Sequence, residues 1–148
     1  MSVYKTDLLL IHPNDQKAVY GDTIRYTACE PPYWCAIVAQ YCLDKGVSVR
    51  IVDAEAENIS FDQVADKVRE YAPALTGIFV TGTNLSASTQ KMQGADATCK
   101  AIKEIGDYPV FLWGLHPSAL PERTLMENDA DYIVAGEGFE TIVNLTRF

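Results

Sequence analysis

The chain has 148 residues, the size of one domain that buries about two-thirds of its unfolded surface. Its net charge of −8 argues against a nucleic-acid partner, because binding to phosphates requires a basic face. No apolar stretch is long enough to span a bilayer, and the polar start followed by a short apolar run at 8–11 does not make a signal peptide. We therefore expect a single cytoplasmic domain over residues 1–148.

The cysteines form no CxxC pair and lack the spacing of a zinc site: Cys29, Cys35, Cys42 and Cys99. Cys35 and Cys42 are seven residues apart and would share one face of a helix. We expect buried free thiols there, with no disulfide and no metal.

The first predicted strand is residues 7–11. A long connection over residues 12–30 follows, because no regular element is predicted before Pro31. Connections of this length are usually functional or disordered, and the mixture of aromatic and charged residues favours an ordered binding loop. The helix that begins at Pro32 has apolar residues at intervals of three and four and ends at Gly46.

Residues 47–52 form the second predicted strand. The connection after it is acidic and is expected to be a solvated loop: Asp53, Glu55 and Glu57. Ser60 and Gln63 then have the spacing of a capping box, and Ile59 and Val64 that of a hydrophobic staple.

Residues 78–88 carry no charge. Their first half is an apolar run that is typical of a strand buried on both faces, and their second half is rich in Thr, Ser and Gly. A buried strand that leads into an uncharged, hydroxylated loop indicates a neutral or amphipathic ligand. The predicted helix that follows ends at Gly106.

Residues 109–113 are the fourth predicted strand, and they lead into Gly114-Leu115-His116-Pro117. A short helix at 121–126 precedes the fifth strand at 131–135. The last predicted helix is residues 139–145.

Strands and helices alternate along the chain, and short apolar strands separated by amphipathic helices predict a parallel sheet covered on both faces. Right-handed crossovers give an α/β, Rossmann-like (flavodoxin-like), doubly wound fold with five strands in the order 2-1-3-4-5. Ligands bind such folds at the carboxyl ends of the strands, above the switch point between strands one and three. The connections after strands one, three, four and five all emerge there, so this edge is the predicted binding site.

Several ligand classes of this fold lack their motifs here. Residues 12–16 lack the small residues with which a flavodoxin loop approaches a phosphate. The third strand ends in Val80-Thr81, where a response regulator requires a phosphoacceptor Asp. There is no GxGxxG and no Walker sequence.

Five segments, in order, resemble the N-terminal cobalamin-binding domain of the cobalamin-dependent radical SAM enzymes. The resemblance covers the chain from about Asp7 to Leu145. The segments are Pro31-Pro32, residues 49–58, residues 77–81, Trp113-Gly114-Leu115-His116-Pro117 and residues 131–138. In that family a barrel follows, in which a CxxxCxxC motif holds a [4Fe–4S] cluster that works with S-adenosylmethionine. No such motif occurs in this sequence, so the resemblance implies a catalytically inactive piece of a longer chain.

The resemblance implies that the corrin lies across the carboxyl edge and that its nucleotide tail runs down between the strands. Small side chains would admit the dimethylbenzimidazole, and hydroxyl and amide donors would reach its ribose and phosphate. The implied contacts follow strands three, four and five: Thr81, Thr83, Leu85 and Ser86; Gly114, Leu115 and His116; Gly136, Glu137 and Gly138.

Cobalamin mutases carry a DxHxxG motif after strand one, whose His ligates cobalt. Residues 12–18 do not match it, so the resemblance implies a domain without a lower His ligand. We expect His12 to be a hydrogen-bonded turn residue, His116 to shape its loop, and Trp34 to belong to the core rather than to cap a corrin. Glu137 either orients a ligand amide or caps the last helix.

The implied function is to present methylcobalamin to the radical SAM barrel for methyl transfer to a substrate radical. Ring closure of the magnesium-protoporphyrin type belongs to the same family. Two other classes stay open: a member that has lost cobalamin and serves as a recognition module, and an unrelated flavodoxin-like domain that binds a nucleotide.

Overall fold

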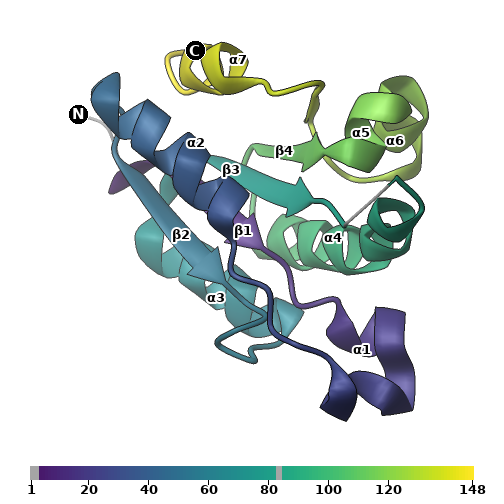
Figure 1. Cartoon of the computed structure of the whole chain (residues 1–148). Coiled ribbons are helices and arrows are strands. Elements are labelled where there is room, and N and C mark those ends of the chain that lie inside the picture. The colour runs from purple at the N-terminus through teal and green to yellow at the C-terminus, as the bar shows by residue number, and fades with distance from the viewer. Residues whose placement is uncertain (1–3, 83–84) are drawn as a thin grey trace.

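The computed structural model describes residues 4–82 and 85–148. Five parallel strands form one sheet in the predicted order β2-β1-β3-β4-β5 (Figure 1). Each predicted strand is present, with its bounds shifted by a few residues: β1 (Thr6–His12), β2 (Val49–Asp53), β3 (Pro73–Val80), β4 (Val110–Gly114) and β5 (Tyr132–Val134).

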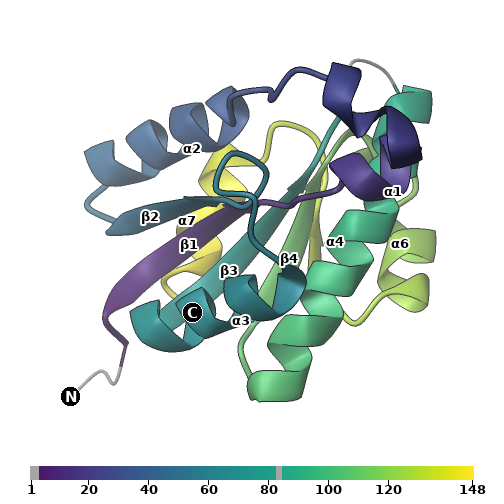
Figure 2. The same cartoon turned by 90° about the horizontal axis from the view of Figure 1, so that it is seen from below.

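Helices cover both faces of the sheet, which confirms the doubly wound architecture. Figure 2 shows α2 (Tyr33–Asp44) on one side and α3 (Phe61–Tyr71) with α4 (Leu85–Ile105) on the other. The last helix, α7 (Phe139–Leu145), packs with α2 on the first side. Among the described residues, no helix combines the length and the apolar character that crossing a membrane requires.

Alternation along the strands divides the core into two clusters, one on each face. Leu8 and Leu10 of β1 pack in the cluster under α2 and α7, whereas Leu9 and Ile11 pack in the cluster under α3 and α4. All four side chains are at most 1% exposed. Because both faces of β1 are buried, its sequence is a continuous apolar run rather than an alternating one.

The prediction of a connection without regular structure over residues 12–30 was wrong. It contains a short helix, α1 (Gln16–Tyr20), and a 3-10 helix, η1 (Gly21–Tyr26). None of the η1 residues is buried, so this segment has no apolar periodicity that sequence inspection could detect. The segment after β4 is also helical, as α5 (Leu115–Ala119), and it precedes the predicted short helix, α6 (Pro121–Glu127).

The capping box of α3 is present as predicted. The Ser60 Oγ accepts a hydrogen bond from the Gln63 backbone N–H at 3.3 Å, and the Gln63 Oε1 accepts one from the Ser60 backbone N–H at 2.8 Å. Ile59 packs against the core cluster that contains Val64, as the staple pattern predicted. These contacts fix where the chain turns from β2 into α3.

Replacing Ser60 with alanine should lower the free energy of unfolding by about 1 kcal/mol, because one N-terminal amide of α3 loses its acceptor. Urea denaturation measures this loss. The matched variant Ser60→Asp keeps a capping oxygen and should stay near the wild-type value. Equal losses in the two variants would contradict a capping role.

Three of the four cysteines are buried thiols: Cys35, Cys42 and Cys99. Burial raises the pKa of Cys35 and Cys99 to about 12 and that of Cys42 to about 11, from an ordinary value of 9.0. Cys29 is exposed. The expected seven-residue pair, Cys35 and Cys42, therefore lies on the buried face of α2.

The domain should lose stability as the pH rises from about 9 towards 12. In that range the unfolded chain releases the protons of these thiols while the folded chain retains them, so the free energy of unfolding falls by about 1.4 kcal/mol per pH unit for each thiol. Urea denaturation at a series of alkaline pH values measures the slope. Cys42→Ala should make the slope shallower; the same slope in Cys42→Ala would contradict this assignment.

Candidate functional site

One row of side chains crosses the sheet at its carboxyl edge. Backbone pairing places His12 beside Asp53 and Phe79 beside Trp113, which in turn pairs with Val134. Ile11 pairs with Ile78, so the next residues of β1 and β3, His12 and Phe79, are neighbours too. Because Phe79, Trp113 and Val134 belong to the core cluster under α2, the row lies on that face of the sheet.

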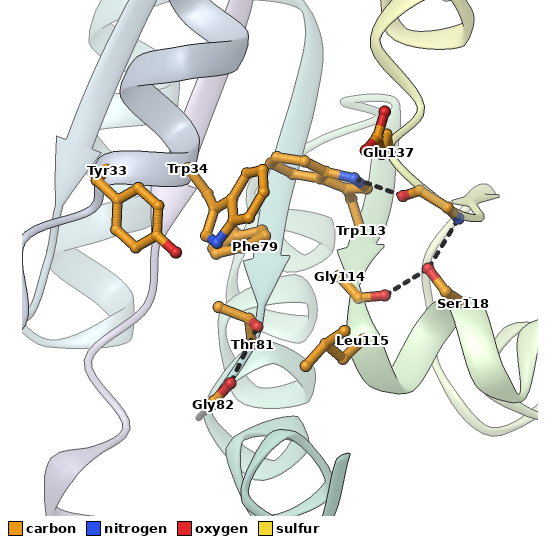
Figure 3. Close-up of a pocket in the computed structure, with 11 residues that line it drawn as sticks. Tyr33, Trp34, Phe79, Thr81, Gly82, Trp113, Gly114, Leu115, Ser118 and Glu137 are labelled. Atoms are coloured by element: carbon orange, nitrogen blue, oxygen red, sulfur yellow. Dashed lines mark hydrogen bonds between the residues drawn. The ribbon is translucent and has the colours of Figure 1, made fainter. Parts of the chain in front are cut away.

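A cavity of about 490 Å³ opens above the β3, β4 and β5 part of this row. Its walls come from the N-terminus of α2, the ends of β3 and β4, α5, and the turn after β5 (Figure 3). The residues that line it are Tyr33, Trp34, Phe79, Thr81, Gly82, Trp113, Gly114, Leu115, Ser118, Gly136 and Glu137. This volume is within the usual range for a small-molecule site, and Glu137 is the only charged residue among the described residues that line it.

Aromatic rings form the floor of the cavity. The rings of Phe79 and Trp113 lie 4.5 Å apart between centroids, and Trp34 lies beside them on the α2 side (Figure 3). The Trp113 Nε1–H donates to the Gly136 carbonyl oxygen at 3.2 Å, so its polar atom already has a partner. The ring faces are therefore the part of the floor that a flat apolar group can contact.

Gly114 lets β4 approach β3 closely at the cavity wall. A Cβ at this position would lie 1.9 Å from the Val80 carbonyl oxygen, and the φ of +136° is one that other residues rarely adopt. Ser118 then ties this point to the turn after β5. Its Oγ donates to the Gly114 carbonyl oxygen at 2.6 Å and accepts from the Gly136 N–H at 2.9 Å.

The structure brings five of the predicted contact residues into the cavity lining: Thr81, Gly114, Leu115, Gly136 and Glu137. Leu85 and Ser86 are exposed in the first turn of α4 and do not line it. Gly138 is the N-cap residue of α7, with a φ of +67°. Thr83 lies outside the described residues.

His116 also lies outside the cavity lining. Its Nδ1 is 2.8 Å from the Thr89 Oγ1, and its backbone N–H donates to the Ser88 Oγ at 3.1 Å. The buried Ser88 Oγ in turn donates to the Val80 carbonyl oxygen at 3.0 Å. His116 therefore shapes its loop, as expected, by joining α5 to α4.

Sequence inspection missed several lining residues, among them Phe79, Trp113 and Ser118. In the sequence, Phe79 and Trp113 cannot be distinguished from other buried residues of apolar strands, and Ser118 belongs to no recognisable motif. The expectation that Trp34 belongs to the core was correct only in part, since it packs against the core and also lines the cavity. Glu137 lines the cavity and directly precedes Gly138, the N-cap residue of α7, so both expected roles of Glu137 stay predictions.

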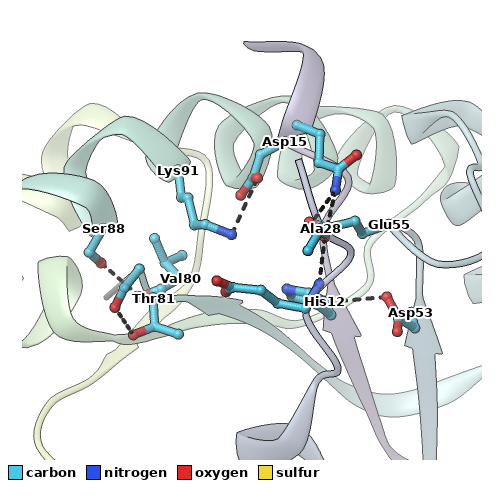
Figure 4. Close-up of polar contacts among 12 residues, drawn as sticks. His12, Asp15, Ala28, Asp53, Glu55, Val80, Thr81, Ser88 and Lys91 are labelled. Carbon is cyan, nitrogen blue, oxygen red and sulfur yellow. Dashed lines mark hydrogen bonds and ion pairs between the residues drawn. The ribbon is translucent and has the colours of Figure 1, made fainter. Parts of the chain in front are cut away.

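A second polar cluster lies at the end of β1 (Figure 4). His12 is 7% exposed, and its Nδ1 is 3.1 Å from the Asp53 Oδ1, so it is hydrogen-bonded as expected, although it belongs to β1 rather than to a turn. The solvated loop predicted for the acidic connection was wrong at Glu55, which is 7% exposed. Burial raises the pKa of the nearby Asp15 carboxyl, and the ammonium of Lys91 opposes this rise. Among the described residues, no His, Cys, Asp and Glu cluster has the geometry of a metal site.

The family model of the B12 binding domain matches residues 21–146. The chain belongs to this family, as its resemblance to cobalamin-binding domains predicted, and cobalamin is its cofactor.

Two curated relatives are each 30% identical to the chain over 93% of its length. One is the anaerobic magnesium-protoporphyrin IX monomethyl ester cyclase of Rubrivivax gelatinosus, and the other is an uncharacterized methyltransferase of Pyrococcus horikoshii. The chain spans 23% of the first and 28% of the second. It therefore corresponds to about a quarter of each relative.

Among solved structures, the fold is similar to that of TsrM from Kitasatospora setae, a radical S-adenosylmethionine methyltransferase. The TM-score is 0.75 at 20% identity, over 95% of this chain and 25% of that one. A second structure of TsrM, with cobalamin and a [4Fe–4S] cluster bound, gives a TM-score of 0.74. At this level of identity the similarity shows the fold, the doubly wound sheet with its covered faces.

The cavity residues fit the tail of cobalamin rather than its corrin. A flat aromatic base matches the Phe79 and Trp113 floor, and the open space around Gly136 leaves room beside it. The corrin is larger than the cavity and would lie outside, over the carboxyl edge. Tyr33 and Leu115, which are 57% and 40% exposed, offer apolar surface at the cavity mouth.

Gly114→Ala should lower the free energy of unfolding by about 3 kcal/mol or more, since the new Cβ meets a backbone carbonyl in a strained conformation. Gly136→Ala is the matched control: its φ is +71°, but nothing lies within 4 Å of a Cβ there. It should cost only about 1–2 kcal/mol. Urea denaturation compares the two, and equal losses would contradict the close approach at Gly114.

Proposed function

We propose that this domain holds cobalamin by its nucleotide tail in the cavity above Phe79 and Trp113, and presents the corrin to a radical SAM domain of the same parent chain. The observation that carries the proposal is the cavity itself. It lies at the carboxyl edge of a doubly wound sheet and has an aromatic floor and walls of small residues. The relatives are a methyltransferase and a cyclase by name, which supports a parent that transfers a methyl group or closes a ring.

Different lining residues contact different parts of the cofactor. Phe79 and Trp113 contact the face of the base, and Gly136, where nothing lies within 4 Å of a Cβ, leaves room for its edges. Within residues 4–82 and 85–148, the Thr81 hydroxyl makes one long hydrogen bond, 3.3 Å to the Gly82 carbonyl oxygen, and it can turn to a ribose or phosphate oxygen instead. The exposed Glu137 can accept a hydrogen bond from a corrin amide.

When bound, cobalamin supplies the methyl group for transfer to a substrate radical. The domain orients the cofactor for this step and shields its buried end from water. The aromatic floor excludes water from the buried end of the ligand, and the fixed strand ends set the height of the corrin above the sheet.

Ring closure is the second candidate reaction of the parent, because a relative that is 30% identical is named as a magnesium-protoporphyrin IX monomethyl ester cyclase. Both reactions would use the same cavity. The choice between them belongs to the partner domain, which binds the substrate.

Hydroxocobalamin mixed with the purified domain and then desalted should leave a corrin spectrum with the protein. Thr81→Phe should abolish this retention, because a ring at this position fills the cavity above Phe79. The control is Thr141→Phe, at an exposed position of α7, which should retain the corrin. Thermal denaturation checks that both variants are folded.

Two results would contradict the proposal. A colourless wild-type protein at high ligand excess would indicate a recognition module without cobalamin or a domain for another ligand. Corrin retention by folded Thr81→Phe that equals the wild-type level would place the ligand outside this cavity.

A further inference from the structure

The segment between β1 and α2, residues 16–30, is here called the arm. Both of its ends meet at one carboxylate oxygen. The Glu55 Oε1 accepts a hydrogen bond from the Gln16 Nε2 at 2.9 Å and another from the Glu30 backbone N–H at 3.2 Å. Gln16 also donates to the Ala28 carbonyl oxygen at 3.4 Å, so the first and last turns of the arm are joined at its base. Glu55 lies on the connection after β2, outside the arm, and its carboxylate holds the two ends of the arm together.

The η1 part of the arm is exposed. None of the η1 residues is buried, and Tyr20, Ile24 and Tyr26 are 43%, 38% and 75% exposed. Figures 1 and 2 show α1 and the turn that follows it beyond the carboxyl ends of the strands, beside the first turns of α4. A segment with so few buried apolar contacts belongs to the low-stability part of a fold.

Asp15, the residue directly before the arm, is in contrast buried against α4. Asp15 is 1% exposed, and a Cβ on Gly94 of α4 would lie 2.7 Å from the Asp15 Cβ. The Lys91 Nζ is 3.4 Å from the Asp15 Oδ1, and neither carboxylate oxygen of Asp15 has a hydrogen bond among the described residues (Figure 4). Asp15 therefore fixes where the arm begins, while Glu55 decides whether the arm is closed.

The far end of the arm leads directly to the cavity. Pro31 and Pro32 connect Glu30 to Tyr33 and Trp34, which line the α2 side of the cavity. The φ angles of the two prolines are fixed, so a displacement of Glu30 also moves Tyr33 and Trp34. Because the hydrogen bond to Glu55 fixes the position of Glu30, it also affects where Tyr33 and Trp34 lie in the cavity wall.

We propose that Glu55 is a positioning residue that closes the arm beside the cobalamin site, and that the arm opens as a unit while the sheet stays folded. The role toward the ligand rests on the proposed function: a corrin above the cavity extends across the carboxyl edge towards β1 and contacts the closed arm. The arm opens when the Gln16 side chain and the Glu30 N–H exchange their hydrogen bonds to Glu55 for hydrogen bonds to water. Among the described residues, no geometric hydrogen bond reaches the buried second oxygen of Glu55, Oε2, although the Cys29 thiol lies near this carboxylate. Oε2 is thus an acceptor that a ligand amide can use.

Limited trypsin digestion of the ligand-free domain tests the closure. Lys17 and Arg25 are exposed cleavage sites within the arm, and Lys100 in α4 is an exposed reference site outside it. Glu55→Ala should speed cleavage in the arm by about tenfold or more, since it removes two hydrogen bonds to a charged acceptor, and should leave the reference site unchanged. Glu55→Gln keeps an acceptor oxygen and should restore most of the protection.

The matched control is Glu57→Ala, two residues further along the same connection. Glu57 is exposed and pairs with Lys67 at 3.0 Å, so its loss should leave the arm protected. Arm cleavage in Glu55→Ala at the wild-type rate would overturn the proposal. So would faster cleavage at the reference site by the same factor, because it would show global unfolding instead of opening of the arm.

Hydroxocobalamin tests the second half of the proposal. Retained corrin, read from the spectrum after desalting, should slow arm cleavage in the wild-type protein, and Glu55→Ala should release the corrin faster than Glu57→Ala. Corrin that is retained without any change in arm cleavage would overturn the contact between arm and ligand. If no corrin is retained at all, the proposed function fails, whereas the digestion of the ligand-free variants still decides the role of Glu55.

Discussion

The site depends on the way in which parallel strands must be connected. Each right-handed crossover carries the chain over one face of the sheet, and here the connection after β1 leads to α2 while the connection after β3 leads to α4 on the opposite face. The chain therefore diverges at the carboxyl edge between neighbouring strands. The first turn of α2, the ends of β3 and β4, α5 and the turn after β5 line the space that this divergence leaves.

Close backbone contacts turn this space into a cavity. Gly114 allows β4 to lie against the Val80 carbonyl, and the Ser118 hydroxyl holds the turn after β5 to the same point. The aromatic floor then follows from strand register, because Phe79 and Trp113 are paired residues on the same face. Towards β1 the same row becomes polar at His12 and Asp53. The edge thus has an apolar half suited to a base and a polar half beside the arm.

The architecture could be predicted from the sequence because its signals are local. Apolar strand segments, the Ser60 and Gln63 pair and the helix-ending glycines each act within a few residues, and together they lead to the correct strand order. The cavity lies at the edge of the sheet where the sequence predicted a site, and Thr81, Gly114 and Glu137 line it, while their contact with cobalamin stays a prediction. Phe79 and Trp113 were not predicted, because the sequence of a doubly buried strand does not show which interior ring borders a cavity. Glu55 was missed for a related reason: its burial arises from Gln16 and Glu30, which are distant in sequence and belong to a segment without periodicity.

The central claim is that the cavity above Phe79 and Trp113 holds the nucleotide tail. The chain contains two tryptophans, Trp34 and Trp113, and both line this cavity, so their fluorescence reports its occupation directly. The most direct measurement is a fluorescence titration with hydroxocobalamin and, in parallel, with cobinamide, the corrin that lacks the nucleotide tail. The account predicts tight quenching by hydroxocobalamin and binding of cobinamide that is weaker by about tenfold or more, since its apolar anchor is absent. Equal affinity for the two corrins would contradict it.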